Sequence, residues 1–137
     1  SNNMKSFKCH KISDGRSEGP AIISTDDVMF YLIDPKTGVV IEEGHSLEHK
    51  SISGKIMIFP SGKGSSVVQA DGLFQLMKEN SQPKGMIVEH PETVLVTSAI
   101  LFEIPMVSQV EPEFYQTVKE GDTVIIDADH ETVTIMD

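Results

Sequence analysis

The sequence contains one cysteine, no tryptophan and only two tyrosines among its 137 residues. The single Cys9 cannot form a disulfide within the chain, nor can it supply the thiolates of an iron–sulfur cluster or a cysteine zinc site. No apolar run approaches the roughly 18 residues that span a bilayer, and the polar first residues do not resemble a signal peptide. We therefore expect a cytoplasmic protein that binds no metal or cofactor of its own.

Positive charge is also scarce, because 11 Lys and Arg stand against 21 Asp and Glu, a formal net charge of −10. Such a surface repels nucleic acids and anionic membranes, so we expect neither as a partner, although a local cationic pocket remains compatible with this charge. The apolar fraction of 39% is ordinary for a globular protein. The length suits one domain over residues 1–137, with residues 1–6 flexible or vector-derived.

The first third of the chain is predicted to form short strands and turns. Residues 28–33 are a nearly continuous apolar run, typical of a buried strand, and residues 39–41 form a second one. Residues 34–38 between them contain a proline that fixes φ and a glycine that accepts a positive φ, so the three segments predict a hairpin. Residues 44–54 are predicted to be a surface connection.

From residue 55 onward, strand and helix patterns alternate. Residues 55–60, 86–88 and 105–107 are predicted to be short buried strands, separated by helices over 67–79 and 93–102. Such an alternation indicates parallel strands with crossover helices. The first helix is predicted to bury its apolar positions Val67, Ala70, Leu73, Phe74 and Met77.

The end of the chain returns to strands. Residues 123–127 and 132–136 are rich in β-branched side chains, and a turn at Gly121 and Asp122 precedes them. We expect these two segments to form a closing hairpin.

The most informative segment is 59–66, Phe-Pro-Ser-Gly-Lys-Gly-Ser-Ser, at the junction of a buried strand and a helix. Free first-turn N–H groups and the helix dipole attract anions there, the glycines allow close approach, and Lys63 adds positive charge. A structural interpretation is also open, in which Ser65 or Ser66 caps the helix and the glycines only make the turn. The spacing matches neither a nucleotide P-loop nor a dinucleotide-binding motif, so nucleotide binding is not indicated.

Five segments, in this order and spacing, resemble the small subunit of the aconitase X family: Gly-Arg-Ser-Glu-Gly-Pro-Ala (15–21), Asp-Pro-Lys-Thr-Gly (34–38), Gly-His-Ser-Leu (44–47), Ser-Gly-Lys-Ile (53–56) and Gly-Lys-Gly-Ser-Ser (62–66). The similarity covers about residues 15–110. It implies a single α/β swivelling domain with a mixed, partly barrel-like sheet and two main helices. It also implies a large-subunit partner that carries an iron–sulfur cluster, and dehydration of a hydroxy acid such as mevalonate 5-phosphate or hydroxyproline.

Residue by residue, the resemblance implies that Ser65 is the catalytic base that removes a proton next to the substrate carboxylate. Gly62, Lys63, Gly64 and Ser66 match the loop that binds the small anionic substrate, with Lys63 where members usually carry arginine. A serine hydroxyl is a poor base near neutral pH, so N–H donors and a cation must stabilise its alkoxide. We expect the isolated chain to be inactive and the docking surface to surround this loop.

Histidine and cysteine do not indicate a metal site. Among five scattered histidines, only His45 and His49 have an i, i+4 spacing, and that pair lies in a predicted loop. We interpret the histidines as solvent-facing or locally hydrogen-bonded, with a structural or interface role for His45. Cys9 is interpreted as a small buried hydrophobic residue rather than a reactive thiol.

Two other functions are weighed. The region from Ile87 to Pro105 is also similar to swivelling phosphohistidine domains, but Thr-Ser-Ala at 97–99 offers no imidazole to phosphorylate, so only the architecture is shared. The second is a non-catalytic anion-binding or regulatory module on the same scaffold. It is favoured by residues 67–69, Val-Val-Gln, because family members usually carry small and hydroxylated residues there.

Overall fold

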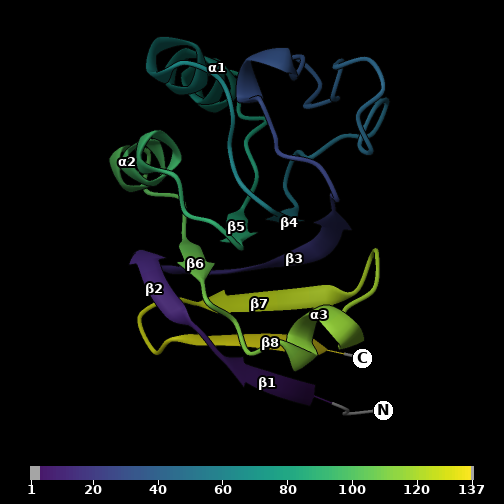
Figure 1. Cartoon of the computed structure of the whole chain (residues 1–137), viewed down its shortest axis with the longest axis vertical. Helices are drawn as coiled ribbons and strands as arrows, with labels where there is room; N and C mark the ends of the chain where they lie inside the picture. Colours follow the sequence, from purple (N-terminus) through teal and green to yellow (C-terminus); the bar gives the residue numbers. More distant parts are fainter. Residues whose placement is uncertain (1–3, 137) are drawn as a thin grey trace.

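The computed structural model describes residues 4–136, and they form one mixed sheet with two helices, α1 and α2, on one of its sides and the short α3 on the other (Figure 1). The sheet has eight strands in the order β1-β8-β7-β3-β4-β5-β6-β2. The elements follow the chain as β1 (Met4–Lys8), β2 (His10–Ser13), β3 (Arg16–Ile23), the 3-10 helix η1 (Phe30–Leu32), β4 (Ile56–Phe59), α1 (Ser66–Lys78), β5 (Gly85–Val88), α2 (Thr93–Leu101), β6 (Met106–Ser108), α3 (Glu113–Thr117), β7 (Thr123–Asp127) and β8 (Thr132–Met136).

The sheet curls toward a barrel. β1 and β2 stand at the two ends of the strand order, yet only Cys9 separates them in the chain. The two edges of the sheet must therefore approach each other, and Figure 1 shows β2 continuing into the line of β1. β3, β4, β5 and β6 run parallel, and the other neighbours are antiparallel. The predicted mixed, partly barrel-like α/β domain is confirmed.

The parallel strands are buried on both faces, which explains their continuous apolar sequence. Every residue of β4, β5 and β6 is buried. One core lies between these strands, α1, α2 and residues 28–52, and a second lies inside the curled sheet. The predicted alternation of strands and helices from residue 55 is confirmed, because β4, α1, β5, α2 and β6 follow one another with the strands as parallel neighbours.

The closing hairpin is confirmed as well. β7 and β8 pair along their whole length, and both bury every second residue. The preceding turn uses Gly121 at a φ of 85°. The short α3, which the sequence analysis does not predict, inserts Phe114 into the second core, where its ring centroid lies 5.6 Å from that of Phe7.

Residues 28–33 do not form the predicted strand. Val28 makes a single bridge to Gly62, after which the chain enters η1. Helix α1 crosses this segment so closely that a Cβ on Gly72 would lie 2.3 Å from the amide nitrogen of Tyr31. The apolar run is therefore buried against a helix rather than in the sheet, an alternative that an apolar run of this length leaves open.

The predicted hairpin is reduced to its turn. The amide of Gly38 donates to the carbonyl oxygen of Asp34 at 2.7 Å, and Ile33 and Val40 form one antiparallel bridge. Residues 39–41 make only isolated bridges instead of the predicted strand. The connection that follows, 44–54, is irregular as expected, but it does not lie wholly on the surface, because Leu47 and Ile52 are buried in the first core.

Helix α1 buries Leu73 as predicted, but its buried face is rotated from the predicted one. Val67 and Phe74, predicted to face the core, are 76% and 47% exposed. The physical reason is the crossing of η1, which packs where Gly72 leaves room and thereby fixes the rotation of the helix about its axis. The residues that α1 buries are Gln69, Gly72, Leu73 and Leu76.

Residues 4–6 begin β1 and pair with β8, in contrast to the flexible end expected for residues 1–6. Residues 1–3 lie outside the described residues. Across the described part of the chain, none of the helices has the length and apolar character needed to cross a membrane.

Candidate active site

The predicted anion-binding loop lies at the carboxyl edge of the parallel strands. Residues 60–65 lead from β4 into α1, and residues 89–92 lead from β5 into α2. The two loops are tied together, because the carbonyl oxygen of Pro60 accepts from the amide of His90 at 2.9 Å and the Ser61 hydroxyl donates to the His90 carbonyl oxygen at 2.7 Å. Open parallel sheets bind ligands at this edge.

Ser65 is the N-cap of α1, so the predicted helix cap is confirmed. Its backbone is extended, with φ −68° and ψ 161°, and its Oγ accepts from the amide of Val68 at 3.4 Å. This distance is long for such a bond, so the hydroxyl is held only loosely. Ser65 and Ser66 are both exposed. The first-turn amides of Ser66 and Val67 have no acceptor within the helix, and they lie beside the hydroxyl.

The two glycines have different roles. Gly64 is exposed and has a φ of 106°, a conformation that other residues rarely adopt. Gly62 is buried, and a Cβ there would lie 2.6 Å from Oε1 of Gln69. Gln69 itself is 3% exposed, and its Nε2 donates to the carbonyl oxygen of Gly64 at 2.8 Å. Gln69 thus braces the loop from inside the fold, although its position in the helical period predicts a polar outer residue.

Lys63 is already paired with a carboxylate. Its Nζ lies 2.6 Å from Oε2 of Glu42, and the side chains are 37% and 21% exposed. Lys63 also contributes to the lowered pKa of Asp26, whose main cause is the hydrogen bond from the backbone N–H of Ser46. No sequence pattern indicates Glu42, because 21 positions separate it from Lys63.

Helix α2, which begins at the same edge, carries its own negative cap. The Glu92 carboxylate accepts from the amides of Val94 and Leu95 at 2.6 and 3.4 Å. A carboxylate therefore already occupies the N-terminus of α2, whereas a neutral serine caps α1. Of these two helix N-termini, that of α1 is the one open to an external anion.

The histidines serve local hydrogen bonds. His45 is buried, with Nε2 2.8 Å from the carbonyl oxygen of Asp27, and its Nδ1 accepts from the amide of Leu47 at 2.9 Å. The predicted structural role of His45 is confirmed, and His49 is exposed. Between residues 4 and 136, the structure contains no group of three or more His, Cys, Asp or Glu placed to hold a metal ion.

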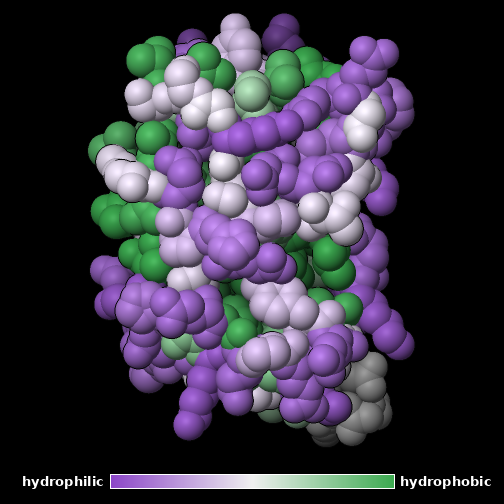
Figure 2. All heavy atoms as spheres, in the orientation of Figure 1, coloured by the Kyte–Doolittle hydropathy of each residue, from purple (hydrophilic) through white to green (hydrophobic). Residues whose placement is uncertain are grey.

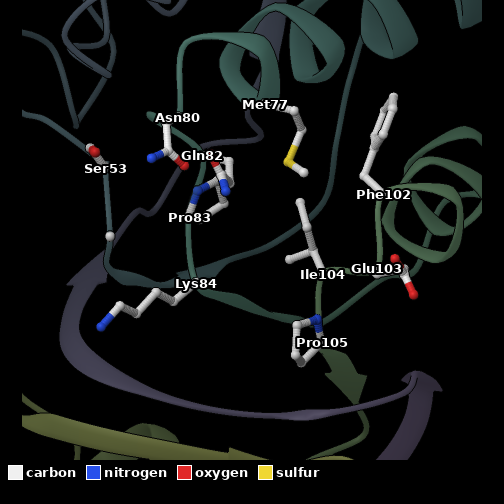
Figure 3. Close-up of a pocket in the computed structure, with 11 residues that line it drawn as sticks. Ser53, Met77, Asn80, Gln82, Pro83, Lys84, Phe102, Glu103, Ile104 and Pro105 are labelled. Carbon is white, nitrogen blue, oxygen red and sulfur yellow. The ribbon is translucent and has the colours of Figure 1, made fainter.

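Two surface pockets lie away from this loop. One, of about 380 Å³, is at the opposite, amino edge of the parallel strands, where Gln82, Lys84, Phe102 and Ile104 line it (Figure 3). The other, of about 560 Å³, lies between residues 12–15 and the end of α2. Both differ from the loop in having no helix N-terminus among their lining residues.

A curled mixed sheet with a serine-capped helix at the carboxyl edge of its parallel strands has the architecture of an α/β swivelling domain. The family model described as the aconitase X swivel domain matches residues 6–135. The chain belongs to the aconitase X swivel domain family, and the resemblance noted in the sequence is confirmed.

Similar proteins cover nearly the whole chain. The phosphomevalonate dehydratase small subunit of Methanocella arvoryzae is 44% identical over 122 residues, which cover 88% of this chain and 92% of that protein. The protein of the same name from Methanothrix thermoacetophila is 40% identical over 132 residues, 96% of this chain and 95% of that one. The crystal structure of Thermococcus kodakaraensis aconitase X (holo-form) matches with a TM-score of 0.88 and 38% identity, over 97% of this chain and 99% of that chain.

Proposed function

We propose that this chain is the small subunit of a phosphomevalonate dehydratase, a heteromeric hydro-lyase that removes water from mevalonate 5-phosphate. The names of the similar proteins support this substrate over hydroxyproline, and the words "small subunit" support a large-subunit partner. The observation that carries the proposal is the exposed, loosely held hydroxyl of Ser65 beside the first-turn amides of α1.

Ser65 is the proposed base. In the dehydration, the Ser65 oxygen takes the proton from the carbon next to the carboxylate, and the hydroxyl leaves from the neighbouring carbon as the double bond forms. The first-turn amides and Lys63 favour this step because they stabilise negative charge on the serine oxygen. The same amides and the exposed Gly64 backbone bind an anionic group of the substrate.

An iron–sulfur cluster is proposed for the large subunit, and it would supply Lewis-acid chemistry for departure of the hydroxyl. The residues of this chain do not fit such a cluster. Its one cysteine, Cys9, is half-buried against the second core, and burial, with smaller effects of Glu131 and Asp127, raises the Cys9 pKa to about 11. A thiol in that state is a poor ligand, since metals bind the thiolate.

The large subunit is proposed to cover the loop, because the reaction needs a site closed to bulk water. Val67, next to the loop, is 76% exposed. Hydrophobic side chains also gather along the side of the molecule where α1 and α2 lie (Figure 2). They include Phe74, Ile100 and Leu101, of which each is at least 47% exposed.

The test is turnover of the assembled enzyme. Co-expression with the large subunit is expected to yield dehydration of mevalonate 5-phosphate, and Ser65→Ala is expected to lower kcat by about a hundred- to ten-thousand-fold. Ser65→Asn keeps a helix cap without a hydroxyl, so it separates loss of the base from loss of the cap. Ser53→Ala at the opposite edge of the sheet is the matched control. Near-normal turnover of both Ser65 variants would exclude the base, and an inactive wild-type complex would exclude the function.

A non-catalytic anion-binding or regulatory module is the second candidate. The ion pair between Lys63 and Glu42 favours the absence of catalysis, because the paired ammonium group is less available to stabilise a serine alkoxide. Tight binding of a carboxylate or phosphate by the chain alone, without association with a large subunit, would support this candidate.

A further inference from the structure

Glu42 lies against the proposed anion-binding loop without belonging to it in sequence. Its Oε2 is 2.6 Å from Nζ of Lys63, within the range of a charge-assisted hydrogen bond. Because only 21% of the Glu42 side chain and 37% of the Lys63 side chain are exposed, water screens this pair less than a pair on an open surface.

Main-chain bonds hold both partners of the pair in position. The amide of Lys63 donates to the carbonyl oxygen of Val28 at 3.1 Å. On the Glu42 side, the amide of Ile41 donates to the carbonyl oxygen of Leu32 at 2.9 Å. The carbonyl oxygen of Glu42 accepts from the backbone amide of His45 at 3.3 Å. The backbone segments that carry Glu42 and Lys63 are therefore held next to each other, with their side chains within reach of one another.

The pair changes what an incoming anion meets. Alone, Lys63 would add one positive charge to the helix N-terminus, but Glu42 supplies a negative charge at hydrogen-bond distance from it. Asp26 adds a second carboxylate within the electrostatic range of Lys63. An anion that approaches the loop is thus attracted by the α1 amides and repelled by these carboxylates.

We propose that Glu42 sets the anion affinity of the loop by acting as the internal counter-ion of Lys63. A phosphate or carboxylate group then binds by displacing the Glu42 carboxylate from the Lys63 ammonium group. This proposal rests on the proposed anion binding by residues 62–66. Glu42 then lowers the anion affinity of the loop, because an anion must compete with an attached carboxylate for the same ammonium group.

The test is the affinity of the full-length chain for inorganic phosphate. It is measured from the NMR chemical shifts of the loop amides during a phosphate titration at constant ionic strength. Glu42→Gln is expected to tighten phosphate binding about two- to fivefold, the range of a partly exposed ion pair. Glu43→Gln is the matched control, because it removes the same charge from the exposed neighbouring position. It is expected to leave the affinity unchanged. In a Lys63→Met background, Glu42→Gln is expected to give no gain.

Three results would overturn the proposal: unchanged or weaker binding in Glu42→Gln, an equal gain in Glu43→Gln, or a gain that persists without Lys63. Absence of phosphate binding in Glu42→Gln would overturn it too, since removal of the competing carboxylate should expose the loop cation. None of these outcomes decides whether Ser65 is the base. That question depends on turnover of the assembled enzyme. Failure of the Glu42 proposal can therefore be distinguished from failure of the proposed dehydratase function.

Discussion

The side-chain amide of Gln69 donates from Nε2 to the carbonyl oxygen of Gly64 at 2.8 Å, so α1 holds the loop that precedes it. Its Oε1 faces Gly62 and has no hydrogen-bond partner among the described residues. The position of the Ser65 hydroxyl therefore depends on a buried residue one helical turn further along the chain.

A methyl group on Gly62 is expected to disturb this arrangement. The new Cβ would lie 2.6 Å from Gln69 Oε1 and 3.3 Å from Leu95 Cδ2, so Gly62→Ala should lower the free energy of unfolding by about 1–3 kcal/mol. Denaturant unfolding measures this change. Gln69→Ala removes the opposing oxygen, so Gly62→Ala should cost less in that background. Additive effects of the two substitutions would show that the contact is not the cause.

A charge on Val67 is expected to block assembly without unfolding the chain. The side chain is 76% exposed in the first turn of α1, where the negative charge of an aspartate interacts favourably with the helix dipole. Val67→Asp should therefore keep its thermal unfolding temperature, while co-purification with the large subunit falls. Met4→Asp, a change at the exposed residue of β1 with 61% exposure, is the control and should assemble normally. Equal recovery of the two complexes would remove Val67 from the docking surface.

The features that the sequence predicts are those that depend on neighbouring residues. The short apolar strands after residue 55, the serine cap of α1 and the turn at Gly38 each follow from a local pattern, and the structure contains all three. The family resemblance adds the curled sheet, which no local pattern shows. The site loop is found because its glycines, lysine and serines are contiguous.

The features that the sequence does not predict depend on distant contacts. Nothing near Gly72 indicates that the backbone of Tyr31 will cross it, and that crossing turns an expected strand into η1 and rotates α1. Glu42 reaches Lys63 only because both segments end at the same edge of the fold. Gln69 is buried because it satisfies the loop carbonyl, which overrides its polarity.

Asp26 is expected to make the free energy of unfolding fall as the pH becomes acidic. The hydrogen bond from the backbone N–H of Ser46, at 2.9 Å, lowers the Asp26 pKa below its usual 3.8. The ionised carboxylate therefore stabilises the folded state above the unfolded pKa, and this contribution is lost as the pH falls through the lowered value. Asp26→Asn should be less stable than wild type at pH 7, and the difference should shrink below about pH 4.

Denaturant unfolding at several pH values measures this dependence. Asp27→Asn is the matched control, since it removes the adjacent carboxylate and leaves the bond between Ser46 and Asp26 in place. It should reduce the stability at pH 7 less than Asp26→Asn does. A stability difference for Asp26→Asn that stays constant from pH 7 to pH 3 would contradict the assigned cause.

Cys9 is expected to react slowly with alkylating reagents in the folded chain. Burial raises its pKa to about 11 from a reference of 9.0, with smaller effects from Glu131 and Asp127. At pH 8 the thiolate is then about one part in a thousand, against about a tenth for an ordinary thiol with that reference pKa. Alkylation by iodoacetamide should therefore be at least about a hundredfold slower than in the chain unfolded by guanidinium, and Glu131→Gln should speed it modestly. Rates within a few-fold of each other in the folded and unfolded chains would mean that Cys9 is a reactive thiol after all.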